Sequence, residues 1–252
     1  MTRCAAPWIG FASMAMPIKF GIVAALEREV RPLLRCSVRM RTTADTVFHE
    51  FPAAVIVCGG IGAERAREAA EALIAAYHPT ILVSAGFAGA VEPKLKPGDV
   101  FMASTVLDVA SGRSFRTQQG NGVLATARMI AGQQQKAELA KIGAAAVDME
   151  ASAVAQVAAQ HGSAFLAIKG ISDEFNFPMP AMERFVSAAG KFQTAQFITH
   201  VALRPHRWLT VKRLAANCAR AANALSDALD TLLAAGSVTK TESGDTVRLD
   251  SV

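Results

Sequence analysis

Five carboxylates stand where side chains could take part in chemistry. Glu27 and Glu29 follow one apolar run, Asp148 and Glu150 close a second, and Asp173 closes a third. The carboxyl ends of parallel strands meet at one edge of a sheet, so carboxylates that are distant in sequence can line a single crevice there. This spacing predicts a site in which acidic groups from three segments surround one ligand.

Each carboxylate also has a structural interpretation. Asp148 and Asp173 could cap the helices that follow them, and Glu27 and Glu29 could lie in the exposed first turn of a helix, where negative charge is favourable. Glu150 is harder to explain in this way, because it lies within the apolar stretch "VDMEASAVA". An unpaired buried carboxylate costs several kcal/mol, so Glu150 predicts either a structural partner or a bound ligand.

The elements that must position these residues are short apolar runs separated by helical patterns. The runs span residues 18–26, 53–59, 80–86, 99–107, 122–130, 143–149 and 165–172. Continuous hydrophobicity is typical of strands covered on both faces, and the clearest helical pattern covers residues 63–77. The alternation predicts an α/β fold: a single domain with a central, mostly parallel, twisted (mixed) sheet flanked by helices.

The expected domain covers residues 18–235. Residues 1–17 are predicted to be a disordered or start-site extension, and residues 236–252 a flexible tail. Residues 174–205, rich in Phe and Pro, predict a flap followed by a helix. Residues 208–233 predict an amphipathic helix, with Leu214, Cys218, Leu225, Leu229 and Leu232 forming its apolar stripe.

Composition excludes several classes of protein. The chain is 52% hydrophobic, which argues against disorder, and no run of about 18 uncharged apolar residues could span a bilayer. The net charge of +5 comes without a basic and aromatic groove motif, so no nucleic acid is expected as a partner. The five histidines show no ligand spacing and no C-x-x-C pair is present, which predicts no metal. We expect a cytoplasmic protein.

Two glycine-rich turns follow predicted strands. They are "CGGIGAER" at residues 58–65 and "SAGFAGA" at residues 84–90, where Gly86 would allow the backbone to approach a ligand closely. The first turn lacks the G-K-[ST] ending of a P-loop, and neither turn has the dinucleotide fingerprint G-x-G-x-x-G. No cofactor is therefore predicted.

Taken together, these segments resemble the nucleoside phosphorylase and nucleosidase superfamily, in particular its methylthioadenosine/S-adenosylhomocysteine nucleosidase branch. The resemblance rests on "FGIVAALEREV", "GGIGAERA", "SAGFAGAVEPKLKPGD", "AAAVDMEASAVA" and "AIKGISDEF", which follow one another in the family's order. It covers roughly residues 18–177.

The resemblance implies a role for each matching residue. Asp173 would protonate the purine at N7, Glu29 would activate the attacking water, and Glu150 would bind the ribose hydroxyls. The remaining substrate-binding residues implied are Met149, Phe87, Gly86, Met129, Ile130 and Ser172. The family normally has a small polar residue where Phe87 stands, so a larger and more apolar pocket edge is expected here.

These roles fit the chemistry of an N-glycosidic bond. Its cleavage builds positive charge on the ribose while electrons flow into the departing base, so a carboxylate near the sugar and an acid at the base stabilise the transition state. An aspartate can donate a proton at neutral pH only if its site raises its pKa or the substrate shares the proton. The apolar approach "FLAIKGI" (165–171) predicts the first of these for Asp173.

Alternative functions stay open at this point. Phosphate could replace water as the nucleophile, as in the phosphorylase-like group associated with hopanoid lipid synthesis, which the "AAAVDME" segment also resembles. Arg28 and Arg65 could bind that phosphate, but a carboxylate at Glu29 would repel it, which favours hydrolysis. A catalytically idle nucleoside-binding protein, or one associated with a membrane, is a further alternative.

The expected partner is a small-molecule nucleoside, and the resemblance implies a homo-oligomer. The basic residues of segment 204–213 would suit peripheral contact with a membrane surface. Packing of the apolar stripe on the core, with solvated lysines and arginines opposite, explains the same pattern.

Overall fold

The computed structural model describes residues 18–43, 46–178, 185, 193 and 208–238 of the 252-residue chain. The predicted extension at residues 1–17 lies outside the described residues, as do most of the flap at 174–205, residues 204–207 of the basic segment and residues 239–252 of the tail. None of the helices in the described ranges is long and apolar enough to cross a membrane.

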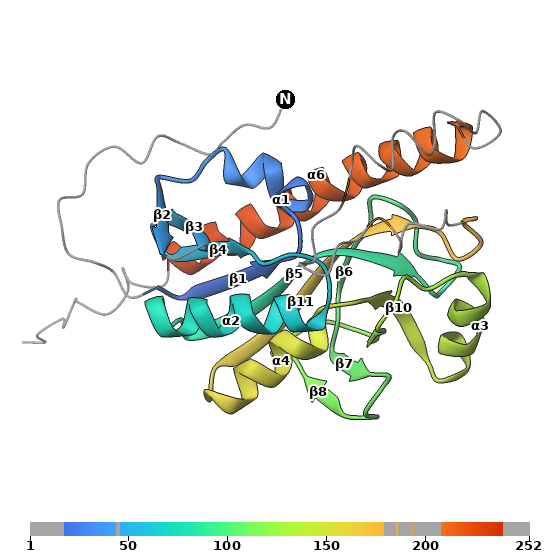
Figure 1. Ribbon diagram of the computed structural model, residues 1–252, viewed down its shortest axis with the longest axis horizontal. Helices are drawn as coiled ribbons and strands as arrows, with labels where there is room; N and C mark the ends of the chain where they lie inside the picture. Colours follow the sequence, from blue (N-terminus) through green and yellow to red (C-terminus); the bar gives the residue numbers. More distant parts are fainter. Residues whose placement is uncertain (1–17, 44–45, 179–184, 186–192, 194–207, 239–252) are drawn as a thin grey trace, which may run out of the picture.

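Eleven strands and five labelled helices make up the described part of the chain (Figure 1). The strands are β1 (Phe20–Ala24), β2 (Arg39–Thr43), β3 (Thr46–Phe51), β4 (Ala54–Cys58), β5 (Ile81–Ala90), β6 (Val100–Met102), β7 (Thr105–Asp108), β8 (Ser114–Arg116), β9 (Val123–Thr126), β10 (Ala144–Asp148) and β11 (Ala164–Asp173). The helices are α1 (Glu27–Leu34), α2 (Ala63–Tyr77), α3 (Gln133–Lys141), α4 (Ala151–Gln160) and α6 (Trp208–Val238).

All the strands belong to one sheet. Its order is β2-β3-β4-β1-β5-β10-β9-β7-β8, while β11 pairs with β5 and with β6. The predicted α/β class and central sheet are confirmed, and helix 63–77 is present with the predicted bounds.

The sheet is more mixed than the apolar runs suggested. Strand β1 pairs in parallel with β4 and β5, and β5 pairs in parallel with β11. The antiparallel pairs include β10 with β5, β6 with β11, β2 with β3, and β7 with β8. Three strands were not predicted: β2, β3 and β8. The end strands β2 and β8 are largely exposed, β2 at every residue, which accounts for their charged or polar sequences. Strand β3 lies between β2 and β4 and buries Phe48, His49 and Phe51, but its mixed sequence "TVFHEF" has no continuous apolar run.

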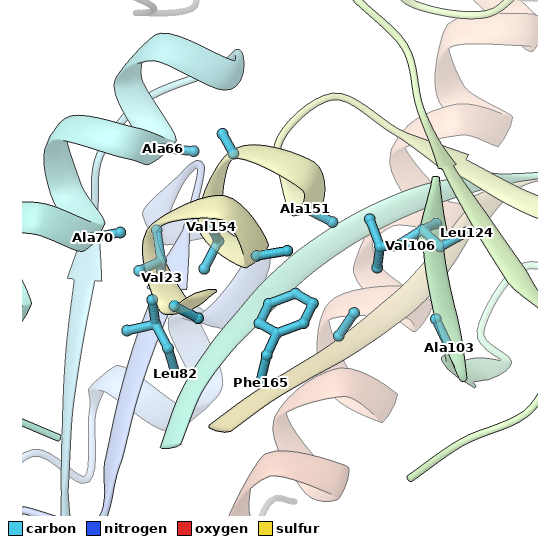
Figure 2. Close-up of a cluster of buried hydrophobic side chains, with 14 of the residues drawn as sticks. Val23, Ala66, Ala70, Leu82, Ala103, Val106, Leu124, Ala151, Val154 and Phe165 are labelled. Atoms are coloured by element: carbon cyan, nitrogen blue, oxygen red, sulfur yellow. The ribbon is translucent and has the colours of Figure 1, made fainter. Parts of the chain in front are cut away.

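Helices cover the sheet on two faces. On one face α2 and α4 lie side by side, and their small side chains pack on the strands with Val23, Leu82 and Phe165 (Figures 1 and 2). The alanines of these helices permit close approach: Ala66 and Ala70 of α2 are almost fully buried. On the other face α1 packs against α6.

The predicted amphipathic helix is confirmed as α6, which runs five residues beyond the expected end. Leu225 and Leu229 of its stripe are fully buried, Leu214 is buried, and Cys218 and Leu232 are partly exposed. The face of α6 that carries the stripe therefore packs on the core. Its first two residues, Trp208 and Leu209, are exposed.

Candidate active site

The site lies beside the middle of β5, where two strands leave a gap along one of its edges. Strand β1 pairs with β5 only as far as Ser84, and β10 pairs with it only at Gly89 and Ala90. Because β10 is antiparallel to β5, its carboxyl end points back toward the carboxyl end of β1. The segments that carry Glu29 and Glu150 therefore approach each other across this gap.

Strand β11 brings the third acid to the same place. It pairs in parallel with β5 along the opposite edge, and Asp173 lies in register with Gly89. Asp173 is buried at the end of β11, and no helix begins in the residues described directly after it, 174–178. The alternative interpretation of Asp173 as a helix cap finds no support there.

A cavity of about 550 Å³ occupies this position. Its volume falls within the range of roughly 300–1,000 Å³ that is usual for sites that bind small molecules. Its wall includes Glu29, Phe87, Met129, Ile130, Met149, Glu150, Ser172 and Asp173, which are all but one of the predicted site residues. Residues from at least four distant segments thus surround one nucleoside-sized space.

Gly86, the remaining predicted residue, does not itself line the cavity. A Cβ atom at this position would stand 2.8 Å from Oε2 of Glu29, and the φ of Gly86 is +143°, a value that disfavours other residues. The structure thus places Gly86 beneath the carboxylate of Glu29, and its lack of a side chain makes room for that carboxylate.

Glu29 is buried, while its neighbours Glu27 and Arg28 are exposed. Of the two acids in the first turn of α1, only Glu29 therefore faces inward. Its Oε2 accepts a hydrogen bond of 3.4 Å from the backbone N–H of Leu26. Burial raises the pKa of Glu29, and the positive charge of Lys169 opposes that rise. A carboxylate whose pKa is moved toward neutrality is suited to accept a proton from water.

Lys169 forms the buried cationic centre of the site. Its Nζ lies 2.9 Å from Oδ2 of Asp148 and donates a hydrogen bond of 2.9 Å to the hydroxyl of Ser84. Asp148 also accepts hydrogen bonds from Thr126 Oγ1 (2.8 Å) and from the backbone N–H of Ala151 (2.8 Å). Asp148 is thus an ion-pair partner that also accepts from the first backbone N–H of α4, although Glu150 and not Asp148 is the N-cap residue of that helix.

Glu150 has structural partners as well as a cavity to face. Its Oε1 accepts a hydrogen bond of 2.9 Å from the backbone N–H of Gly62, and its Oε2 one of 3.3 Å from that of Met149. Gly62 is the N-cap of α2, where the helix dipole favours a negative charge. Desolvation by burial and the nearby charge of Asp148 nevertheless raise the pKa of Glu150 to about 7.

This pKa predicts that nucleoside binding depends on pH. Ribose hydroxyls donate to a carboxylate, and Glu150 loses its charge as the pH falls below about 7. We expect the affinity for a C-glycosidic adenosine analogue, which cannot be cleaved, to be about tenfold lower at pH 6 than at pH 8, as measured by calorimetry. Free adenine lacks the ribose and is the control ligand. A pH dependence that persists in Glu150→Gln, or is equal for adenine, would contradict this assignment.

Asp173 is held by two side-chain donors. The hydroxyl of Ser172 donates to its Oδ1 (2.7 Å), and the ammonium of Lys136 on α3 forms a buried ion pair with its Oδ2. Lys136 also donates to the carbonyl of Glu174 at 2.9 Å. The surroundings of Asp173 are therefore not purely apolar. Two lysines, Lys136 and Lys169, lie within what the sequence suggested was an apolar environment.

Of the two buried lysines that were not predicted as site residues, one had a signal in the sequence and the other had none. Lys169 was detectable, since a lysine inside the apolar run "FLAIKGI" needs a buried partner. Lys136 was not, because a lysine in the polar segment "QQQKAELAK" is typical of an exposed helix. The cavity wall contributed by α6 was also missed: Val211, Leu214, Ala215, Cys218 and Ala219.

The arrangement places three carboxylates, Glu29, Glu150 and Asp173, in the wall of one cavity. Carboxylates placed in this way can stabilise a positive charge that develops on a bound ligand, or exchange protons with it. Among the residues that the structure describes, no group of three or more His, Cys, Asp or Glu side chains is placed to hold a metal ion.

Comparison with known proteins identifies relatives in sequence and in fold. A sequence model of the phosphorylase superfamily matches residues 19–131 and 109–199. The 5′-methylthioadenosine/S-adenosylhomocysteine nucleosidase of Shewanella halifaxensis is 27% identical over 217 residues, which cover 69% of this chain and 94% of that protein.

Solved structures agree with this comparison. A nucleosidase of the same name from Colwellia psychrerythraea, in complex with adenine, is 25% identical with a TM-score of 0.56 and covers 64% of this chain and 84% of its own. The methylthioadenosine nucleosidase of Arabidopsis thaliana is 18% identical with a TM-score of 0.69, covering 88% and 98%. The second likeness is one of fold.

Proposed function

Because this chain belongs to the phosphorylase superfamily, we propose that it is an enzyme that hydrolyses the N-glycosidic bond of an adenine nucleoside and releases adenine. The observation that carries the proposal is the meeting of Glu29, Glu150 and Asp173 in the wall of one cavity. The nucleosidases of Shewanella halifaxensis and Colwellia psychrerythraea support the choice of reaction and base.

In this reaction each acid has one task. Glu150 accepts hydrogen bonds from the ribose hydroxyls, with Met149 packing on the sugar. Glu29 takes a proton from the water that attacks C1′, and Asp173 delivers a proton to N7 of the base as the bond to N9 breaks. Acid and base catalysis of this kind each contribute about 10²–10⁴-fold to the rate.

The electrostatics of the site favour water over phosphate as the nucleophile. Lys169 is one buried cation beside Asp148, and the charges of Asp148 and Glu29 both act on Glu150. Arg65, one candidate for binding phosphate, pairs with Glu68 on the surface of α2 and does not line the cavity. Arg28 does line it, so phosphorolysis is the second candidate and is decided by experiment.

The nucleoside is proposed to carry a substituent at its 5′ position. The α6 residues in the cavity wall are mainly apolar, as are Phe87, Met129 and Ile130. Apolar walls favour an apolar substituent through the removal of water from both surfaces. Methylthioadenosine, S-adenosylhomocysteine and a bulkier relative such as an adenosyl lipid are the candidates.

Release of adenine tests both the reaction and the nucleophile. We expect the purified protein to release adenine from at least one of methylthioadenosine, S-adenosylhomocysteine and adenosine in a buffer free of phosphate. Added phosphate should not increase the rate, and the sugar product should be the free sugar, identified by mass spectrometry. Turnover only in the presence of phosphate, with a sugar 1-phosphate as product, would establish phosphorolysis instead.

A further inference from the structure

Lys136 is an inward-facing cation on an otherwise exposed stretch of helix. On α3 the adjacent residues Gln133, Gln134 and Gln135 are exposed, while Lys136 is only 2% exposed and contributes to the cavity wall. Its Nζ donates to Oδ2 of Asp173 and to the carbonyl of Glu174. Burial of an ammonium group is costly, so its position beside Asp173 calls for an explanation.

Both oxygens of the Asp173 side chain have hydrogen-bonding partners. Oδ2 accepts from Lys136 and Oδ1 accepts from the hydroxyl of Ser172. An ammonium group held directly against a carboxylate can exchange a proton with it through this contact. The departing base requires a proton, and Lys136 is the neighbour of Asp173 placed to replace the one that Asp173 gives away.

We propose that Lys136 is a positioning residue that stores the proton destined for the leaving base and passes it to Asp173. This inference rests on the proposed function. As the bond between C1′ and N9 breaks, Asp173 gives a proton to N7 and receives one from Lys136. The oxygen of water bonds to C1′, and the proton of that water passes to Glu29. When the products leave, Glu29 returns its proton to solvent and the amine of Lys136 takes one up, so the cycle balances.

The residues around Lys136 and Asp173 accommodate this ion pair. A Cβ atom at Gly89 would lie 2.9 Å from Oδ2 of Asp173 and 3.1 Å from both Cε and Nζ of Lys136, so only glycine on β5 leaves room. The carboxylate of Glu174 pairs with Arg213 on α6, and Lys136 therefore meets the carbonyl of Glu174 instead. Asp148, Glu29 and Glu150, the other acids in the cavity wall, interact with the second lysine, Lys169.

A purely structural ion pair is the competing explanation, and two measurements separate it from proton storage. The first is rescue of Lys136→Ala by a small amine, assayed as adenine release at pH 8, where an ammonium is a better source of protons than a carboxylic acid. We expect kcat to fall by about 10²-fold with little change in KM. Ethylammonium should then raise the kcat of the variant at least tenfold. Lys141→Ala removes an exposed lysine from the same helix and should leave kcat unchanged.

The second measurement uses a substrate that needs no acid. A p-nitrophenyl riboside releases nitrophenolate, which leaves without a proton, so Lys136→Ala should cleave it at close to the parental rate. Equal losses on both substrates without rescue by the amine would show a structural role and overturn the proposal, as would full activity of Lys136→Ala toward the adenine nucleoside. A parent protein that releases no base from any nucleoside would overturn the proposed function and this inference together. Thermal melting of each variant shows that the compared proteins are folded.

Discussion

Asp173→Asn is expected to lower kcat for adenine release by about 10²–10⁴-fold, with a much smaller change in KM. The amide has the shape of the carboxylate but cannot pass a proton from Lys136 to N7. Its oxygen can still accept a hydrogen bond from Lys136, so the loss should be chemical rather than structural. Initial rates with saturating nucleoside, followed as adenine formed, measure the effect.

Two controls make this result specific. Asp227→Asn changes an exposed carboxylate on α6, and we expect its turnover to equal that of the parent. The double variant Asp173→Asn with Lys136→Met removes the buried charge that Asp173→Asn leaves behind. It should regain any lost thermal stability without regaining activity. If Asp173→Asn turned over at the parental rate, Asp173 would have no part in the mechanism.

Lys169→Met is expected to destabilise the protein by about 3–5 kcal/mol, because it leaves a buried carboxylate without its cation. The side chains of Lys169 and Asp148 are 1% and 0% exposed, so water cannot replace the lost charge. Methionine retains most of the volume, which separates the electrostatic effect from a cavity effect. Urea unfolding followed by circular dichroism gives the change in the free energy of unfolding.

The matched control is Lys141→Met, which removes an exposed lysine paired with Glu138 within α3. Exposed pairs of this kind contribute about 0–1 kcal/mol, so this variant should be close to the parent in stability. A loss below about 1 kcal/mol in Lys169→Met would mean that Thr126 and Ala151, the other donors to Asp148, satisfy it without the lysine.

The antiparallel pairing of β10 shows where reasoning from apolar runs reached its limit. The run at residues 143–149 predicts a buried strand, and β10 is one. Hydrophobicity, however, records only that both faces of a strand are covered, and not the direction of its neighbours. The parallel strands β1 and β11 therefore point their carboxyl ends the same way along the sheet, as predicted, whereas β10 reaches the site from the opposite direction.

The burial of Lys136 shows a second limit. An ammonium in a polar helix is usually solvated, so the polar residues around Lys136 predict that its side chain is exposed to solvent. Only the packing of α3 and its approach to the end of β11 turn that side chain inward toward Asp173. The same holds for α6, whose apolar stripe was predicted but whose contribution to the cavity wall was not.

By itself the sequence determined the α/β class, the helix at 63–77, the long C-terminal helix, the acids that stand at strand ends and the glycine turn after β4. These features follow from local periodicity and from the cost of an acid inside an apolar run, both of which are readable along a single segment. The turn predicted at residues 84–90 is wrong, because these residues continue β5 in its pairing with β11. The tertiary structure alone decided the direction of β10, the partners of Glu150 and Asp148, and the pairing of Lys136 with Asp173. Each of these depends on contacts between segments far apart in the chain. For the charged side chains, pairing is governed by the free-energy cost of removing a charge from water, and that cost arises only when those segments pack together.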